Sequence, residues 1–240
     1  MIAPGGDQTR GDSSLFLDAS LPATLSCNEA AALAMKAARG AGMAWGLAEE
    51  AGFATAWLVE RGVDGPASLH AHLTHAEGLD WSDLCPTVAP GAWGAVPGGT
   101  LCPIALGATL CDHAALPAGP LSGPPLAIGP VAHPLLLLPF LAVLAERRGC
   151  AVDLAWEDHA VAIGAPDGWL DAAVTALSAQ GRLRFELDVR AAPWCPAPPA
   201  APPAIAAATI AGLTDYALRT TVPASVASRA GAGATTPDDD

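Results

Sequence analysis

The sequence predicts an α+β protein in which an N-terminal helical hairpin packs with a mainly antiparallel sheet and a central apolar helix. Apolar residues recur every three to four positions in residues 26–61, and residues 134–148 are apolar nearly all round, as in a buried helix. Residues 182–190 alternate strictly between apolar and polar side chains, which is typical of a strand with one buried face. Helices and strands alternate without βαβ regularity or a glycine-rich nucleotide loop, so we expect a mainly antiparallel sheet.

The hairpin is predicted from its start and stop signals. Ser26 and Glu29 are spaced as in a capping box, in which a hydroxyl and a carboxylate satisfy backbone N–H groups at the helix start. Gly40 and Gly42 are expected to end the first helix, because glycine takes the left-handed conformation of a tight turn without strain. The second helix is expected to begin near Gly46 and to end at Gly62.

The joint of the hairpin carries a group of residues that binding sites often use. Lys36, the only lysine, and Arg39 come just before the joint, and Trp45, Glu49 and Glu50 follow it. One interpretation is structural: cations suit the end of the first helix and anions suit the start of the second. The other is functional, with the two cations and the free N–H groups of the second helix binding an anion.

The middle of the chain is predicted to contain one short helix and little else that is regular. Residues 66–77 begin with proline and read as a third helix. Residues 78–99 are rich in Gly, Pro, Trp and Asp and read as a loop. Residues 101–110 are predicted as a strand or hairpin, and residues 117–130 are dense in turn signals with a short apolar segment.

The second half of the chain gives the clearest elements. Residues 134–148 are predicted as the central helix, because they are apolar on every side. Residues 151–156 and 160–164 read as two strands of a hairpin joined by a short polar turn. Residues 167–179 are predicted as a helix with Asp at its cap.

A proline-rich segment precedes the last predicted helix, residues 205–219, and a tail rich in Gly and Ala. Polyproline segments are extended and stiff, so this one is predicted to be a linker. The tail holds few charges, which disfavours a solvated end and predicts that it docks on the main domain. The predicted divisions are a loose extension (1–24), an α+β domain (25–192), the linker (193–203), and the docking helix and tail (204–240).

The composition excludes several classes of partner. The chain has 24 acidic and 11 basic residues, a net charge of −13, so nucleic acids and anionic membrane surfaces are not expected as partners. Six cysteines occur without a C-x-x-C pair, and the first residues lack a signal core, which indicates a cytoplasmic protein with reduced thiols. The longest apolar run is shorter than a bilayer requires.

Three histidines in the predicted third helix raise the question of a metal site. His72 and His75 share a helix face, whereas His70 points elsewhere. A further ligand would have to come from nearby acids or a thiol, namely Asp80, Asp83 or Cys85. Because no metal-binding signature such as H-E-x-x-H is present, we prefer a helix whose histidines bind no metal.

Several stretches resemble an uncharacterised family of proteobacterial domains of unknown function. The resemblance implies no activity, but it covers most of the chain after residue 24. The stretches are Ser26-x-Asn28-Glu29, Lys36-Ala-Ala-Arg-Gly-Ala-Gly, Trp45-Gly-Leu-Ala-Glu-Glu-Ala, Pro134-Leu-Leu-Leu-Leu-Pro-Phe-Leu and Val222-Pro-Ala-Ser…Ser228-Arg-x-Gly-Ala-Gly-Ala.

Two functions are compatible with these observations. The first is a cytoplasmic metabolic protein that binds a small carboxylate or phosphate between hairpin and tail, as an isomerase, lyase or hydrolase with Glu49 or Glu50 as general base. The second is a non-catalytic accessory or assembly subunit of a metabolic enzyme. The sequence leaves open whether the chain is an enzyme and which cofactor, if any, it uses. The residues expected to bind the anion are Lys36, Arg39, Trp45, Arg219, Ser225 and Arg229.

We predict that the protein is a homodimer with two-fold symmetry. Apolar residues make up 52% of the chain and charged residues only 15%, so a monomer would expose large apolar patches. Light scattering at micromolar concentration should therefore give twice the mass of the chain. The mass of a single chain would contradict this prediction.

Overall fold

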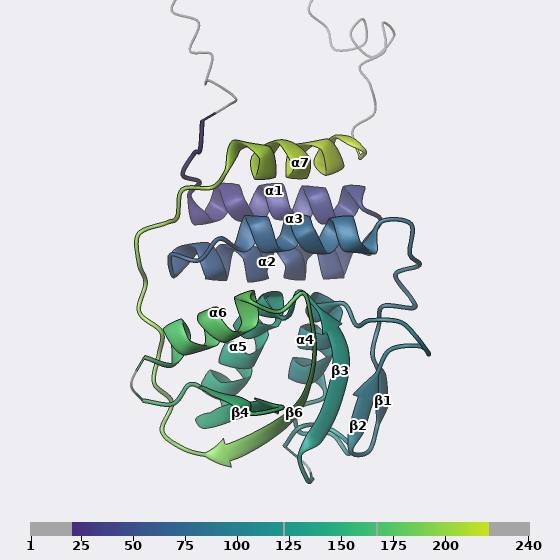
Figure 1. Cartoon of the computed structure of the whole chain (residues 1–240), viewed down its shortest axis with the longest axis vertical. Helices are drawn as coiled ribbons and strands as arrows, with labels where there is room; N and C mark the ends of the chain where they lie inside the picture. Colours follow the sequence, from purple (N-terminus) through teal and green to yellow (C-terminus); the bar gives the residue numbers. More distant parts are fainter. Residues whose placement is uncertain (1–20, 122, 167, 221–240) are drawn as a thin grey trace, which may run out of the picture.

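In the part of the chain that the structure describes, four helices stack in one half of the molecule, and three further helices and a sheet form the other half (Figure 1). The computed structural model describes residues 21–121, 123–166 and 168–220. The helices are α1 (Cys27–Gly40), α2 (Trp45–Glu60), α3 (Gly65–Ala76), α4 (Pro103–Asp112), the short 3-10 helix η1 (Pro134–Leu137), α5 (Leu138–Arg148), α6 (Trp169–Ser178) and α7 (Ala207–Leu218).

The strands form one curved sheet in the order β1-β2-β3-β6-β4-β5. Among the described residues, β2 and β3 pair in parallel and the other neighbours are antiparallel. The predicted α+β class with a mainly antiparallel sheet is therefore confirmed. The strands are β1 (Thr87–Ala89), β2 (Ala92–Gly94), β3 (Leu126–Ala132), β4 (Cys150–Trp156), β5 (His159–Ile163) and β6 (Arg182–Ala191).

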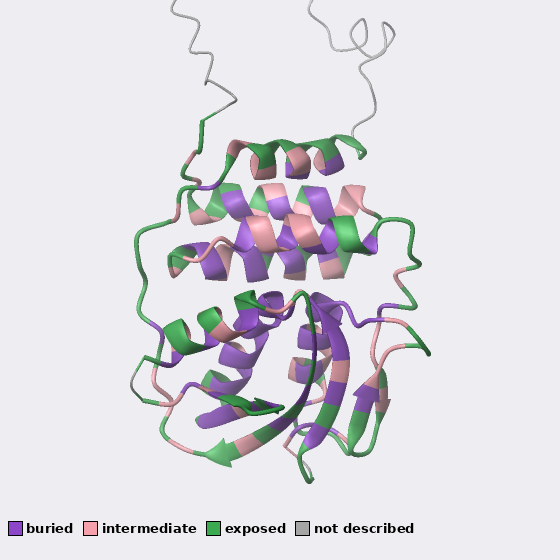
Figure 2. Cartoon of the chain, in the orientation of Figure 1, coloured by how far each residue is buried: buried purple, intermediate pink, exposed green. Residues whose placement is uncertain are grey.

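The helices connect the two halves through their buried faces. α1 packs against both α2 and α7, α2 contacts α4 and α5, and α5 in turn contacts β4 and β5. Buried residues lie where these elements face one another, and exposed residues lie on the outer surfaces of the helices and sheet (Figure 2). No helix within the described ranges has the length and apolar character needed to cross a membrane.

The N-terminal hairpin forms as predicted, with α1 packed along α2. Both halves of the capping box are present: the Glu29 carboxylate accepts from the Ser26 backbone N–H at 2.9 Å, and the Glu29 N–H donates to Ser26 Oγ at 3.3 Å. The small side chains of α1 allow close packing, because Gly52 of α2 lies against the backbone of Ala31. Small side chains therefore line the contact between α1 and α2.

The predicted central helix is confirmed and is divided into η1 and α5. All four residues of η1 are buried, as are seven of the eleven residues of α5. Pro139 stands at the start of α5, where its missing N–H removes no bond within the helix. Gly149 takes a left-handed conformation (φ 60°) and ends α5 directly before β4.

Residues 101–110 were predicted as a strand or hairpin, and this prediction is wrong, because α4 occupies residues 103–112. A short apolar run has no periodicity that separates a buried strand from a buried helix. The tertiary structure decides for the helix: a Cβ on Gly107 would lie 2.3 Å from the Phe140 ring, so α4 and α5 are in close contact. The predicted loop 78–99 is also not wholly irregular, because it contains the short strands β1 and β2.

The later elements follow the predictions more closely. β4 and β5 form the predicted hairpin, and β6 is the predicted alternating strand, with Leu183, Phe185 and Leu187 buried. α6 occupies most of the predicted helix 167–179, and its N-cap is Gly168. The predicted cap Asp167 lies outside the described residues.

The proline-rich segment is extended, and it lies against the domain. Cys195 N–H donates to Gly164 O at 2.9 Å, and Ala200 N–H donates to Glu60 O at 2.8 Å. Trp169 Nε1 donates to Cys195 O at 2.9 Å. These contacts carry the chain back along both halves of the molecule, so that α7 reaches α1.

α7 is held against α1 and α3 by close contacts at glycines. A Cβ on Gly40, the last residue of α1, would lie 1.7 Å from the carbonyl oxygen of Tyr216. A Cβ on Gly212 in α7 would lie 2.2 Å from Nε2 of His70. A backbone bridge between Ala23 and Ile205 places the start of α7 beside the start of α1. Residues 1–20 of the predicted loose extension (1–24) and residues 221–240 of the tail lie outside the described residues.

We predict that Gly40→Ala destabilises the protein by about 1–3 kcal/mol, because the added methyl group overpacks the contact between α1 and α7. For a chain of this size, thermal unfolding should then shift down by about 2–10 °C. Gly46→Ala is the matched control, since a Cβ there meets nothing within 4 Å. Equal melting temperatures for the two variants would contradict the close docking of α7.

Candidate functional site

The residues predicted to form a site at the hairpin joint are brought together only in part. The Arg39 guanidinium donates to the carbonyl of Met43 and lies over the Trp45 ring, 5.6 Å from its centroid. Trp45 Nε1 donates to Glu49 Oε1 at 2.9 Å. Arg39, Trp45 and Glu49 therefore already have partners within the hairpin, and Lys36 is exposed on α1.

The remaining predicted ligand residues lie elsewhere. Arg219, which follows α7, pairs with Glu77 after α3 at 2.9 Å and lies over the Tyr216 ring. Both side chains of this ion pair are about half exposed, so the pair contributes little stability. Ser225 and Arg229 lie outside the described residues. The end of α7 lies against the end of α1, because a Cβ on Gly40 would lie 1.7 Å from the carbonyl oxygen of Tyr216. Arg39 and Arg219 nevertheless have separate side-chain partners, Trp45 and Glu77.

Glu50 faces a cavity between α2, α4 and α5. The pKa of Glu50 is raised, chiefly because burial disfavours its charged form and secondarily because Asp112 is close. The cavity has a volume of about 380 Å³ and is also lined by Glu49, Arg147 and the rings of Phe53 and Phe140. A carboxyl group whose pKa is raised accepts a proton more readily than an ordinary one, as a general base must. Three carboxylates and one arginine surround this space, however, so the cavity repels an anionic ligand.

A second group of titratable residues lies where α3 meets the end of β3. His72 is fully buried, and its Nε2 lies 3.2 Å from Sγ of Cys102, with the hydrogen on either atom. The rings of His72 and His75 lie 6.1 and 5.9 Å from the ring of His133, which follows β3. His133 takes a left-handed backbone conformation (φ 45°), which is uncommon for a residue other than glycine.

Burial keeps His72 and Cys102 uncharged inside the protein. Burial, followed by the effects of His133 and His75, lowers the pKa of His72 to about 3. Burial, followed by the effect of His75, also lowers the pKa of His133. Burial raises the pKa of Cys102 to about 12, so this thiol is not a nucleophile at neutral pH.

No group of three or more His, Cys, Asp or Glu side chains in the described ranges is arranged to hold a metal ion. All six cysteines are free thiols; two of them are buried and four are partly buried. The histidine group therefore consists of a neutral buried pair, His72 and Cys102, with two more accessible imidazoles, His75 and His133, in front of it.

Two arginines of β6 lie beside these imidazoles. The pairing of Ala132 with Arg182 and the bond from His133 N–H to Gly181 O, 3.0 Å, place the start of β6 next to His133. Arg182 Nη2 donates to Gly99 O, and His75 Nε2 lies 3.1 Å from Oγ1 of Thr100, the next residue. One short loop therefore contacts both an arginine and a histidine.

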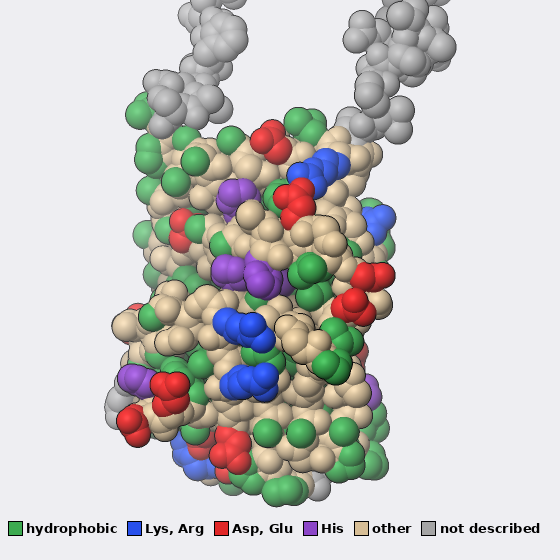
Figure 3. Space-filling model, turned by 45° about the vertical axis from the view of Figure 1, so that its right-hand side comes forward, with side chains coloured by type: hydrophobic (Ala, Val, Ile, Leu, Met, Phe, Trp, Pro, Cys, Tyr) green, Lys and Arg blue, Asp and Glu red, His purple; other side chains and the backbone are tan. Residues whose placement is uncertain are grey.

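Neither of these arginines is neutralised by a carboxylate. Ion pairs among the described residues involve Arg61, Arg190 and Arg219. The guanidinium groups of Arg182 and Arg184 instead donate to backbone carbonyls, at 3.2 and 3.3 Å. Histidine and cationic side chains gather on one face of the molecule (Figure 3). We call His75, His133, Arg182 and Arg184 the basic face.

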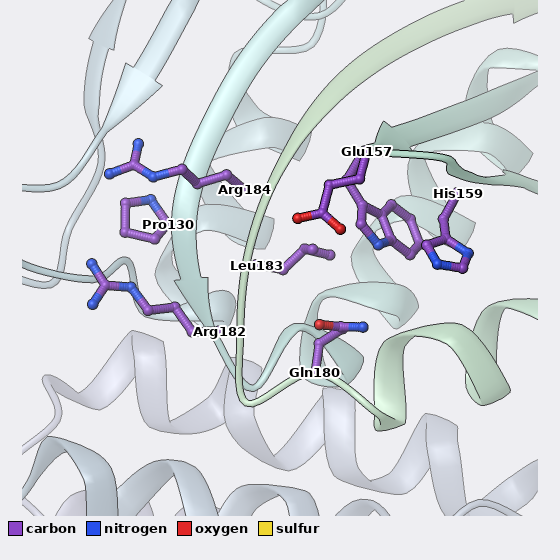
Figure 4. A pocket seen from close by; sticks show the side chains of 8 residues that line it. Pro130, Glu157, His159, Gln180, Arg182, Leu183 and Arg184 are labelled. Carbon is purple, nitrogen blue, oxygen red and sulfur yellow. The ribbon is translucent and has the colours of Figure 1, made fainter.

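A cavity of about 590 Å³ adjoins the basic face and crosses β6 (Figure 4). Arg182 and Arg184 extend over Pro130 on one side of the strand. On the other side, the Glu157 carboxylate and the Gln180 amide approach Leu183, with His159 beyond them. Three non-glycine residues in the described chain have a positive φ, and Glu157 and His133 are two of them. This cavity shares no lining residue with the one at Glu50.

Sequence patterns singled out the residues of the basic face but did not predict that they lie together in the fold. The alternation of residues 182–190 implies one charged face of β6, and three histidines stand close together in α3. The register of β3 against β6 brings these segments together across more than a hundred residues, and no local pattern encodes it.

Residues 25–102 match the model of a family described as "Protein of unknown function (DUF3726)". The predicted resemblance to a domain-of-unknown-function family is thereby confirmed for this segment, which includes the hairpin and α3 but not the arginines of β6. No curated protein and no solved structure matches the chain.

We predict that His72 makes the protein less stable in acid. The unfolded chain takes up a proton at this histidine near pH 6.5, whereas the folded chain does so only near pH 3. The free energy of unfolding should therefore fall as the pH drops through this window, by up to about 1.4 kcal/mol per pH unit.

Urea unfolding at pH 7, 6 and 5 measures this slope. His72→Gln removes the titrating group and should flatten the slope, whatever its effect on stability at pH 7. His159→Gln, at an exposed position, should leave the slope unchanged. If His72→Gln retains the wild-type slope, His72 is not the group that excludes the proton.

Proposed function

We propose that this protein binds a small anionic ligand, a carboxylate or a phosphate, at the basic face. The class of ligand is the one expected from the sequence, and the location moves from the hairpin joint to β6. The observation that carries the proposal is the pair Arg182 and Arg184, which has no carboxylate partner in the described structure. In a protein of net charge −13, two neighbouring cations that form no ion pair can attract an anion.

The geometry suits an anion that accepts several hydrogen bonds. A guanidinium group presents five N–H donors, and each arginine here donates one of them to a backbone carbonyl, which leaves donors for a carboxylate or phosphate oxygen. His75 is exposed and His133 partly buried, so both imidazoles can add a donor or, once protonated, a charge. An anion nearby would favour protonation of His133 and oppose the effect of its burial.

The proposal concerns binding and includes no reaction. The predicted general bases, Glu49 and Glu50, line the separate cavity between α2, α4 and α5. The pKa of Glu50 is raised by its burial, as a general base requires. Its role as a base stays a prediction. Since that cavity is rich in carboxylates, an anion is bound more favourably at β6.

We predict that Arg184→Gln and Arg182→Gln each weaken anion binding by about tenfold or more, because a hydrogen bond to a charged group contributes about 1.5–3 kcal/mol. Calorimetric titration of the full chain with inorganic phosphate and with small dicarboxylates, at low ionic strength, measures this loss.

Two control variants separate the alternatives. Arg190→Gln removes a cation from the same strand, but one that is already paired with Asp153 at 2.8 Å, and should leave affinity unchanged. Lys36→Gln tests the location first expected at the hairpin. An affinity lost with Lys36→Gln and kept with Arg184→Gln would move the site back to the hairpin, and a protein that binds none of these anions would refute the proposal.

A further inference from the structure

The cavity beside the basic face continues into a second one, and the pair forms a long groove. The first cavity, about 590 Å³, holds Arg182 and Arg184. The second, about 610 Å³, lies along α6. They share Trp156, His159 and Gln180, so a ligand held by the arginines can extend toward α6 without leaving the groove. A simple phosphate or dicarboxylate would fill only a small part of this space.

The shared wall of the groove is aromatic. The rings of Trp156 and His159 lie 5.9 Å apart, inclined by 30°, and so present nearly parallel planes. Trp156 is 7% exposed and forms part of the floor, whereas His159 is exposed. A flat ring of the ligand can pack against these planes, since stacking on an aromatic side chain contributes about 1–3 kcal/mol for a nucleic-acid base.

Polar groups that distinguish one ring from another stand beside this wall. The Gln180 amide offers both a donor and an acceptor, and the Glu157 carboxylate offers acceptors only. Both side chains approach the groove from the side opposite to the arginines (Figure 4). Such a set fits the edge of a heteroaromatic ring that carries amino and carbonyl groups, or the hydroxyl groups of a sugar.

The two ends of the groove also differ in charge. Glu157 and Asp171 line the groove away from the arginines and repel an anion there. The charge of the ligand is therefore placed at Arg182 and Arg184, and its uncharged ring at Trp156 and His159.

We infer that the groove binds a nucleoside monophosphate, with the phosphate on Arg182 and Arg184 and the base beside Trp156, His159 and Gln180. This inference rests on the proposed function and specifies its ligand. A mononucleotide is preferred to a polynucleotide, because the net charge of −13 opposes binding of an extended phosphate backbone.

Calorimetric titration of the full chain with AMP, GMP, CMP and UMP tests the inference, with ribose 5-phosphate, inorganic phosphate and the free nucleosides as comparisons. At least one nucleotide should bind ten or more times as tightly as ribose 5-phosphate and as its own nucleoside. His159→Ala and Gln180→Ala should reduce the affinity for that nucleotide severalfold and leave ribose 5-phosphate unaffected, whereas Arg184→Gln should weaken both.

His113→Ala is the matched control, because His113 also lies 5.9 Å from a tryptophan ring, that of Trp93, at a different place in the fold. It should change no affinity. If ribose 5-phosphate binds as tightly as every nucleotide, or if His159→Ala and Gln180→Ala have no effect on nucleotide binding, the inference is wrong and the proposed anion site stands. If neither nucleotides nor the simpler anions bind, the proposed function fails as well.

Discussion

The antiparallel pairing of β3 with β6 is the interaction on which the candidate site depends. This pairing sets Ala132 opposite Arg182, and the backbone bond from His133 to Gly181 continues it past the end of β3. Alternation along β6 sends Leu183 and Phe185 into the core, which obliges Arg182 and Arg184 to face outward. A shift of register by one residue would reverse this arrangement, burying the arginines and exposing the apolar side chains. The core thus secures the position of the cations.

A buried polar pair, His72 and Cys102, lies beside this strand pairing and lowers the stability of the fold. His72 lies on the inner face of α3, with Nε2 close to Cys102 and with Nδ1 lacking a hydrogen-bond partner in the described chain. An unpaired buried polar atom costs about 1–3 kcal/mol, so this arrangement is not the most stable one available. The ring supports His133, whose strained backbone conformation leads from β3 into η1. This stability cost occurs at the place where the imidazoles and arginines meet, as is common near binding sites.

Charge divides the surface into places that suit different ligands. At the hairpin joint, Arg39, Trp45 and Glu49 contact one another, and at the end of α7 Arg219 contacts Glu77. The cavity at Glu50 gathers carboxylates, whereas at the start of β6 neither Arg182 nor Arg184 forms an ion pair among the described residues. Within a strongly acidic chain, the last of these is the place where an anion gains the most and is repelled the least.

Local patterns in the sequence determined most of the secondary structure. The capping box at Ser26, the uniformly apolar residues 134–148 and the alternation of residues 182–190 each depend on neighbours within a few positions, and each predicted its element. The tertiary structure alone decided that residues 103–112 are helical, because their apolar run fits either element and the contact with Phe140 selects the helix. It alone decided the site as well: Arg39 and Arg219 have separate side-chain partners, Trp45 and Glu77. His75, His133 and Arg182 are distant in sequence, and the ring contact of His75 with His133 and the pairing of β3 with β6 bring them together. Residue types and spacing along a chain report local geometry, and a binding site is made by contacts between segments that only the folded core brings together.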